Sequence, residues 1–194
     1  RRRPSRPRTR QQTALHRAVF TTLRMNLQNG SNPSLAAGAT FKFQHATFTS
    51  GPWTDVGAIG SGGTWRGHDN ATPADGAAIT TVLLTSSFNN ARQTYEESNI
   101  ATTTNSIGNG KEAEFAWVVQ DNAATGGTAY YFRMVRSDGT ALAGYTTYPQ
   151  ITPATASVTV TESGGSTSIV EGGATDTYDI VLDTEPIWHS LRHL

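Results

Sequence analysis

The chain has 194 residues, of which 36% are hydrophobic and 15% are charged, so it can bury the core of one domain and still carry extensions. Gly, Ser, Thr and Asn are frequent, and this composition favours strands and turns over helices. Because cysteine is absent, the sequence excludes disulfides, thiolate zinc sites and cysteine nucleophiles.

A formal net charge of zero hides an asymmetry along the chain. Residues 1–24 hold eight of the fifteen basic residues and no acidic residue, and the remaining seven basic and fifteen acidic residues give residues 25–194 a net charge of −8. We therefore expect no nucleic-acid binding by the acidic body. Residues 1–21 are predicted to be a disordered basic head, with binding of phosphate, anionic lipid or an acidic surface as the alternative. No membrane span is expected, because no apolar run is long enough.

Alternation of apolar and polar residues predicts strands in the first half of the chain. Leu23, Met25 and Leu27 share one face in LRMNL, and Phe41 and Phe43 share one face in FKFQHATF. Between segments rich in turn residues, further strands are predicted over residues 53–59, 64–68, 79–84 and 91–99. The composition of the last of these segments fits a helix as well as a strand.

The clearest strand patterns lie in the second half. In KEAEFAWVVQ, Phe115 and Trp117 share a face opposite Glu112 and Glu114, and AYYFRMVRSDG alternates in the same way. The loop DNAATGGT between them predicts a β-hairpin. A further strand-like segment covers residues 141–152. With about seven to nine strands at this spacing, the sequence predicts an all-β antiparallel sandwich of the immunoglobulin or fibronectin type over residues 22–150.

Residues 155–186 predict a second, incomplete unit. After a linker at 151–154, the segments SVTVTESGGSTSIVEGG and DTYDIVLD are predicted to contribute two strands. Two strands alone cannot bury their apolar face. We expect them to be either the first strands of a following domain or strands available to a partner. Residues 187–194, IWHSLRHL, form a tail that continues neither pattern.

Two segments resemble known families. Residues 22–150, through the strings WTDVGAIGSGGTWRG, TYEESN, EFAWVVQ and YYFRMVRSDGTAL, resemble a module of predicted surface and secreted proteins of environmental bacteria. The resemblance implies an extracellular or cell-surface location within a multidomain chain, and it supplies no ligand. Residues 155–186, through VEGG, Tyr178 and IVLDTEP, resemble the start of a Calx-beta domain, a surface-exposed β-sandwich of adhesive proteins.

The Calx-beta resemblance also implies a candidate calcium site. In that family, a Glu of the first strand and acidic residues of the end loops can bind calcium, and by position the match falls on Glu171, with Asp183 as the weaker candidate. Calcium takes about six to eight oxygen ligands, so two carboxylates do not complete a site. A solvated acidic turn is the alternative interpretation.

Catalytic motifs are absent from the sequence. The five histidines lack the spacing of a helical zinc-protease motif, and no Gly-x-Ser-x-Gly elbow occurs. Glu96 and Glu97 are adjacent, so on a strand they would point to opposite faces, which does not suit a glycosidase pair. We predict no enzymatic activity, and an enzyme such as a glycan hydrolase would rest only on analogy at the level of the fold.

Aromatic residues offer a candidate carbohydrate site. Trp53 and Trp65, together with Tyr95, Tyr145 and Tyr148, would form a platform for stacking sugars if several were exposed together. Packing in the core or at an edge is the alternative for each of them. Trp53 and Trp65 are the candidate ligand-binding residues.

Three hypotheses follow for function. The first is a non-catalytic structural or adhesive module of a bacterial cell-surface or secreted multidomain protein. The second is a self-assembling subunit of an extracellular filament or virion, in which the C-terminal strands pair with a neighbouring copy. The third is a carbohydrate-binding module. The expected partners are copies of the chain or neighbouring surface-protein modules, with glycans in the third case, and calcium is the one cofactor that the resemblance implies.

Overall fold

The computed structural model describes residues 20–30, 33–84, 90–145, 147–155, 157–162, 173 and 177–182. Within these residues the regular secondary structure consists of strands, without a helix, which confirms the all-β prediction. The strands are β1 (Phe20–Gln28), β2 (Thr40–Ala46), β3 (Thr54–Asp55), β4 (Trp65–Gly67), β5 (Asn90–Glu96), β6 (Ile100–Thr102), β7 (Glu112–Asp121), β8 (Tyr130–Arg136), β9 (Gln150–Ile151), β10 (Val158–Glu162) and β11 (Tyr178–Leu182).

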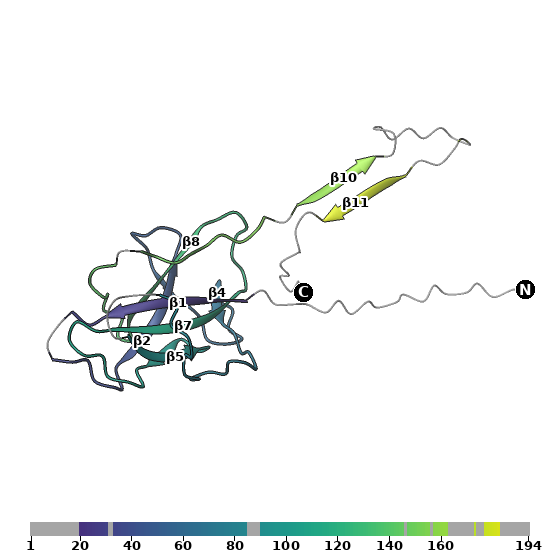
Figure 1. Ribbon diagram of the computed structural model, residues 1–194. Helices are drawn as coiled ribbons and strands as arrows, with labels where there is room; N and C mark the ends of the chain where they lie inside the picture. Colours follow the sequence, from purple (N-terminus) through teal and green to yellow (C-terminus); the bar gives the residue numbers. More distant parts are fainter. Residues whose placement is uncertain are drawn as a thin grey trace, which may run out of the picture.

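The body of the molecule consists of two sheets (Figure 1). In the four-stranded sheet, β7 is central: β1 runs antiparallel along one side of it, and β4 and β5 lie along the other. In the five-stranded sheet, the order is β3-β2-β8-β9, and β6 also pairs with β2. All of these pairs are antiparallel except β5 with β7, so the predicted antiparallel sandwich is confirmed with one parallel pair.

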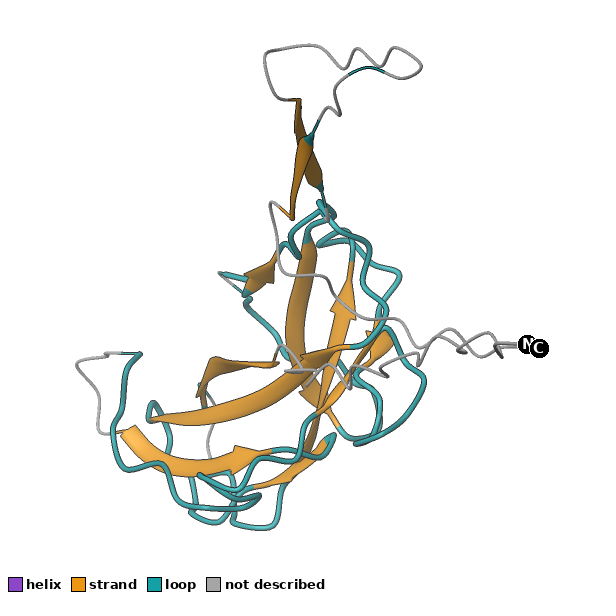
Figure 2. Cartoon of the chain, turned by 90° about the vertical axis from the view of Figure 1, so that its right-hand side faces the viewer, coloured by secondary structure: helices purple, strands orange, loops and turns teal. Residues whose placement is uncertain are grey.

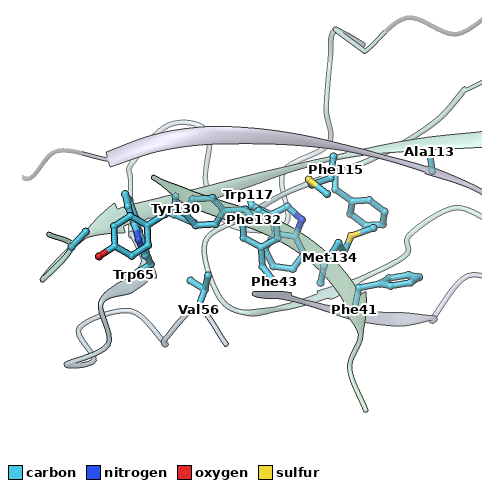
Figure 3. Packing of buried hydrophobic residues seen from close by; sticks show 14 of the residues in the cluster. Phe41, Phe43, Val56, Trp65, Ala113, Phe115, Trp117, Tyr130, Phe132 and Met134 are labelled. Carbon is cyan, nitrogen blue, oxygen red and sulfur yellow. The ribbon is translucent and has the colours of Figure 1, made fainter. Parts of the chain in front are cut away.

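Aromatic side chains from both sheets fill the space between them (Figure 3). Phe43 of β2 is fully buried and stacks on Trp117 of β7 and on Phe132 of β8, with ring centroids 5.1 and 5.5 Å apart. Phe41 meets Phe115 edge to face at 5.8 Å. The apolar faces predicted for β2 and β7 therefore pack against each other, because strand side chains alternate and only one face of each sheet points inward.

The predicted hairpin between the strands at 111–120 and 129–139 is wrong. The strands exist as β7 and β8, but they belong to different sheets and do not pair. The connecting residues 122–129 cross from one sheet to the other, which is how consecutive strands of a sandwich often connect. Alternation alone identifies each strand's inner face and does not distinguish a partner in the same sheet from one across the core.

The strand predicted over residues 79–84 is also wrong. Ala78 forms an isolated bridge to Thr94, and the residues after it form no strand. The backbone N–H groups of Leu83 and Leu84 instead donate to the Glu114 carboxylate, at 3.1 and 2.8 Å to Oε2. These amides are satisfied by a buried side chain from β7, which replaces the ladder hydrogen bonds of a strand.

Other predicted strands are present but shorter than expected. The segment 53–59 contains only the two residues of β3, and the segment 141–152 contains only the two residues of β9. The segment 91–99 forms a strand, β5, as predicted. The sequence gives no indication of β6, which has three residues.

The two C-terminal strands form a separate hairpin. β10 pairs antiparallel with β11 from Val158↔Leu182 to Glu162↔Tyr178. Every residue of the two strands is exposed. The hairpin extends away from the two sheets in both views (Figures 1 and 2). The strands expected within residues 155–186 are therefore present, and no described residue of the body covers them.

Candidate functional site

The two tryptophans predicted to contact sugars occupy different environments. Trp65 of β4 is only 2% exposed, and its ring meets Phe132 edge to face at 5.1 Å inside the core. Its faces are therefore not available to a ligand, and for Trp65 the packing alternative describes the structure. Trp53 is half-buried and lies just before β3. A sugar contact at Trp53 stays a prediction.

Trp53 belongs to a column of stacked aromatic rings. Its ring stacks on Tyr148 at 5.5 Å, and Tyr148 stacks on Tyr145 at 5.0 Å. The Arg133 guanidinium lies 4.3 Å from the centre of the Trp53 ring. The ring faces thus contact each other and the Arg133 guanidinium. A sugar that stacked on these rings would need the same faces. Burial raises the pKa of Tyr145 to about 12, so its hydroxyl stays protonated at neutral pH.

The candidate calcium ligands, Glu171 and Asp183, lie outside the described residues. Among the residues that the structure describes, no group of three or more His, Asp or Glu side chains is arranged to hold a metal ion. The carboxylates near the end of β5 act as backbone acceptors. Asp75 accepts from the N–H of Glu97 at 2.8 Å, and Glu97 accepts from the N–H of Asn70 at 3.0 Å. These contacts fix the turns at 69–75 and 97–98.

Glu96, the last residue of β5, is a buried carboxyl group with 5% exposure. Its side chain accepts a short hydrogen bond from the Thr94 hydroxyl. Burial raises the pKa of Glu96 to about 7, the hydrogen bond from Thr94 opposes this rise, and the nearby Asp75 carboxylate adds to it. The group therefore changes charge close to neutral pH.

This buried carboxyl should make stability depend on pH. The folded state holds the Glu96 proton up to pH about 7, whereas the unfolded state releases it near the ordinary value of 4.5. The free energy of unfolding should therefore fall as pH rises between these two values, by about 3 kcal/mol at most, and then level off. Chemical denaturation at pH 5 and pH 8 should show this slope, reduced in a Glu96→Gln variant. An identical slope in both proteins would contradict it.

A groove with a volume of about 1030 Å³ lies beside β1. One wall is formed by β1 from Arg24 onward, and the other by the segment from Leu142 to Pro149, which follows β8. The large apolar side chains that line it are Met25, Leu27, Leu35, Phe41, Leu84, Met134, Leu142 and Tyr145. Most of these side chains also pack on the hydrophobic core. The groove thus opens onto the interior between the two sheets at the β1 side of the sandwich.

The edge of β1 that faces away from β7 is unpaired. All nine residues of β1 pair with β7, and the opposite side of β7 is taken by β4 and β5. No strand within the described ranges pairs with the outer edge of β1. An edge of this length presents a row of backbone donors and acceptors to any strand that lies beside it.

The C-terminal hairpin has one apolar and one mixed face. Because side chains alternate along a strand, the cross-strand pairs Val158–Leu182 and Val160–Ile180 lie on the same face, and Tyr178 lies there opposite Glu162. The side chains of Val160, Ile180 and Leu182 are 54%, 60% and 59% exposed. A two-stranded hairpin is at best marginally stable alone in water. This face is apolar and exposed, and a surface that covered it would stabilise the hairpin.

The candidate site therefore has two parts, the apolar hairpin face and the groove with the free β1 edge. The sequence predicted the first part, because residues 155–186 carry two strands without the rest of a sandwich. It did not predict the second. That β1 is an edge strand depends on which strands pair with β7, and strand pairing has no local signal in the residues of β1.

Comparison with protein-family models, with curated proteins and with solved structures found no match. Within the described residues, no helix has the length and hydrophobicity needed to cross a membrane.

Proposed function

We propose that the chain is a non-catalytic structural or adhesive module of a bacterial cell-surface or secreted multidomain protein. The observation that supports this most directly is the exposed apolar face of the β10–β11 hairpin beside a body that already has its own core. The core of the body is complete without the hairpin. In this proposal the hairpin therefore contacts a surface outside that body. Contacts between successive sandwich modules are of this kind.

The sequence adds to this proposal. The immunoglobulin- or fibronectin-like module of surface proteins that residues 22–150 resemble, and the Calx-beta start that residues 155–186 resemble, both belong to extracellular chains with several domains. The acidic character of residues 25–194 suits a protein that stays soluble among other surface molecules. In this proposal the hairpin packs with a neighbouring module.

Antibody labelling of the bacterium that encodes the chain tests the proposed location. Antibodies raised against the body should label intact cells or the culture medium as strongly as they label permeabilised cells. A control antibody against a cytoplasmic protein should label only permeabilised cells. Labelling of the chain that requires permeabilisation would contradict the proposal.

A second candidate function is that of a self-assembling subunit of an extracellular filament. The specific observation that favours it is that the chain carries both an unpaired apolar hairpin face and, elsewhere, a groove beside an unpaired strand edge. A chain with two such complementary surfaces can bind copies of itself by strand addition. A chain that remains monomeric in light scattering at all concentrations would remove this candidate.

A further inference from the structure

We propose that β11 of one copy binds along the free edge of β1 in a second copy and inserts its apolar face into the groove there. The inference rests on the second candidate function, self-assembly, and names the two surfaces that would meet. The four-stranded sheet of the acceptor copy would then continue through β1 into β11 and β10 of the donor copy.

The side chains of the two strands match in spacing. On β1, Leu23, Met25 and Leu27 point toward the core at intervals of two residues, and Met25 is 6% exposed. On β11, Tyr178, Ile180 and Leu182 also follow each other at intervals of two. Strands that pair in one sheet place such residues on the same side. Three apolar side chains of β11 would thus enter the groove.

β10 matches the acceptor less well than β11. Its apolar face carries Val158 and Val160, and Glu162 occupies the third position. On β11 all three positions of this face are apolar. Pairing through β11 therefore places only apolar side chains next to the groove and leaves Glu162 at the far side of the hairpin.

The backbones of both strands are free to pair. β11 pairs only with β10 among the described residues, so its other edge has open donors and acceptors, as does the outer edge of β1. Addition of an extended strand to such an edge supplies main-chain hydrogen bonds, while pockets for alternate side chains supply specificity. The groove provides such a pocket only on the core side of the acceptor sheet. The apolar face of β11 must therefore point to that side.

The occupant of the groove is a second copy and not the same chain. All ten residues of β10 and β11 are exposed, so the hairpin does not lie in the groove of its own body. Figure 1 shows β10 and β11 standing away from the sheets of their own body. Donor and acceptor surfaces differ, so the contact is heterologous, and the assembly either grows head to tail or closes into a ring.

Light scattering of the full chain over micromolar to millimolar concentrations, with matched variants of β11, tests the proposal. Ile180→Asp places a charge on the apolar face, and Val181→Asp places the same charge one residue away on the opposite face, at nearly the same exposure (60% and 57%). Ile180→Asp should weaken association by about tenfold to hundredfold, because it removes one buried aliphatic side chain. Val181→Asp should change it by less than about threefold. Equal effects of the two variants would overturn the assigned face.

Hydrogen exchange identifies the acceptor. Amide protection within residues 20–28 should increase with protein concentration in the natural chain and not in Ile180→Asp, because the outer β1 amides become paired only in the assembly. Assembly without added protection in β1 would overturn the groove as the acceptor and leave self-assembly standing. Protection of β1 that is lost in Ile180→Asp but independent of concentration would show binding within one chain. A chain that is monomeric throughout would overturn both the inference and the second candidate function.

Discussion

Replacement of Phe43 by Ala is expected to lower the free energy of unfolding by about 3–5 kcal/mol. Phe43 is fully buried, and its ring stacks on Trp117 of the opposite sheet and on Phe132 of the neighbouring strand. Removal of the ring takes away apolar surface that is buried on folding and leaves a cavity between the two sheets, which neighbours on rigid strands can fill only in part. Equilibrium unfolding in urea, followed by tryptophan fluorescence, measures the loss.

Phe48→Ala is the matched control. Phe48 follows β2 by two residues and is 65% exposed, so the same change in composition should alter the free energy of unfolding by less than about 0.5 kcal/mol. Equal losses in the two variants would show that the ring stack at Phe43 does not hold the two sheets together.

The strands of the core could be predicted from the sequence because their burial is one-sided and local. In β1 and β2, apolar residues alternate with polar ones, and the predicted inner residues Met25, Phe41 and Phe43 are all buried. Alternation reports the face of a strand directly, since side chains point to opposite faces of a sheet in turn. Nothing further along the chain is needed for this prediction.

The predictions that were wrong concern features that depend on contacts between residues far apart in the sequence. Alternation puts Glu114 on the polar face of β7, yet Glu114 is fully buried, because the segment 79–84 covers that face and donates two backbone N–H groups to its carboxylate. The same contact removes the strand expected at 79–84. A partner 30 residues away has no signature in either segment, so neither the buried carboxylate nor the loop could be read locally.

Of the two parts of the candidate site, one could be predicted from the sequence and the other could not. The apolar face of the hairpin follows from alternation within residues 158–182 and could be predicted. The groove beside β1 could not, because an edge becomes visible only when the pairing of all strands in the sheet is known. Local sequence also does not distinguish Trp53 from Trp65, because both lie in turn-rich segments. Only the fold shows that Trp65 is buried against Phe132.

Replacement of Glu114 by Ala is expected to cost about 3–5 kcal/mol of stability, a loss comparable to that of the core phenylalanine. Its carboxylate is 0% exposed and lies 2.7 Å from Nη1 of Arg24, whose side chain is 14% exposed. Without it, a largely buried guanidinium loses its counter-ion, and the N–H groups of Leu83 and Leu84 lose their acceptor. Lys42→Met removes the more exposed ion pair with Asp55 and should cost only about 0–1 kcal/mol.

A double variant separates the effect of the uncompensated charge of Arg24 from that of the unsatisfied amides. Replacing both partners, Arg24→Met with Glu114→Leu, removes the two charges together and fills their space with apolar atoms, so no uncompensated charge stays in the sheet. Urea denaturation should then show the double variant to be more stable than Glu114→Ala alone, although Leu83 and Leu84 still lack their acceptor. If the double variant were instead as unstable as the single one, the uncompensated charge of Arg24 would not be the cause of the loss. The unsatisfied amides of the 79–84 segment and the lost contacts of Arg24 with Thr81 and Tyr95 would then account for it.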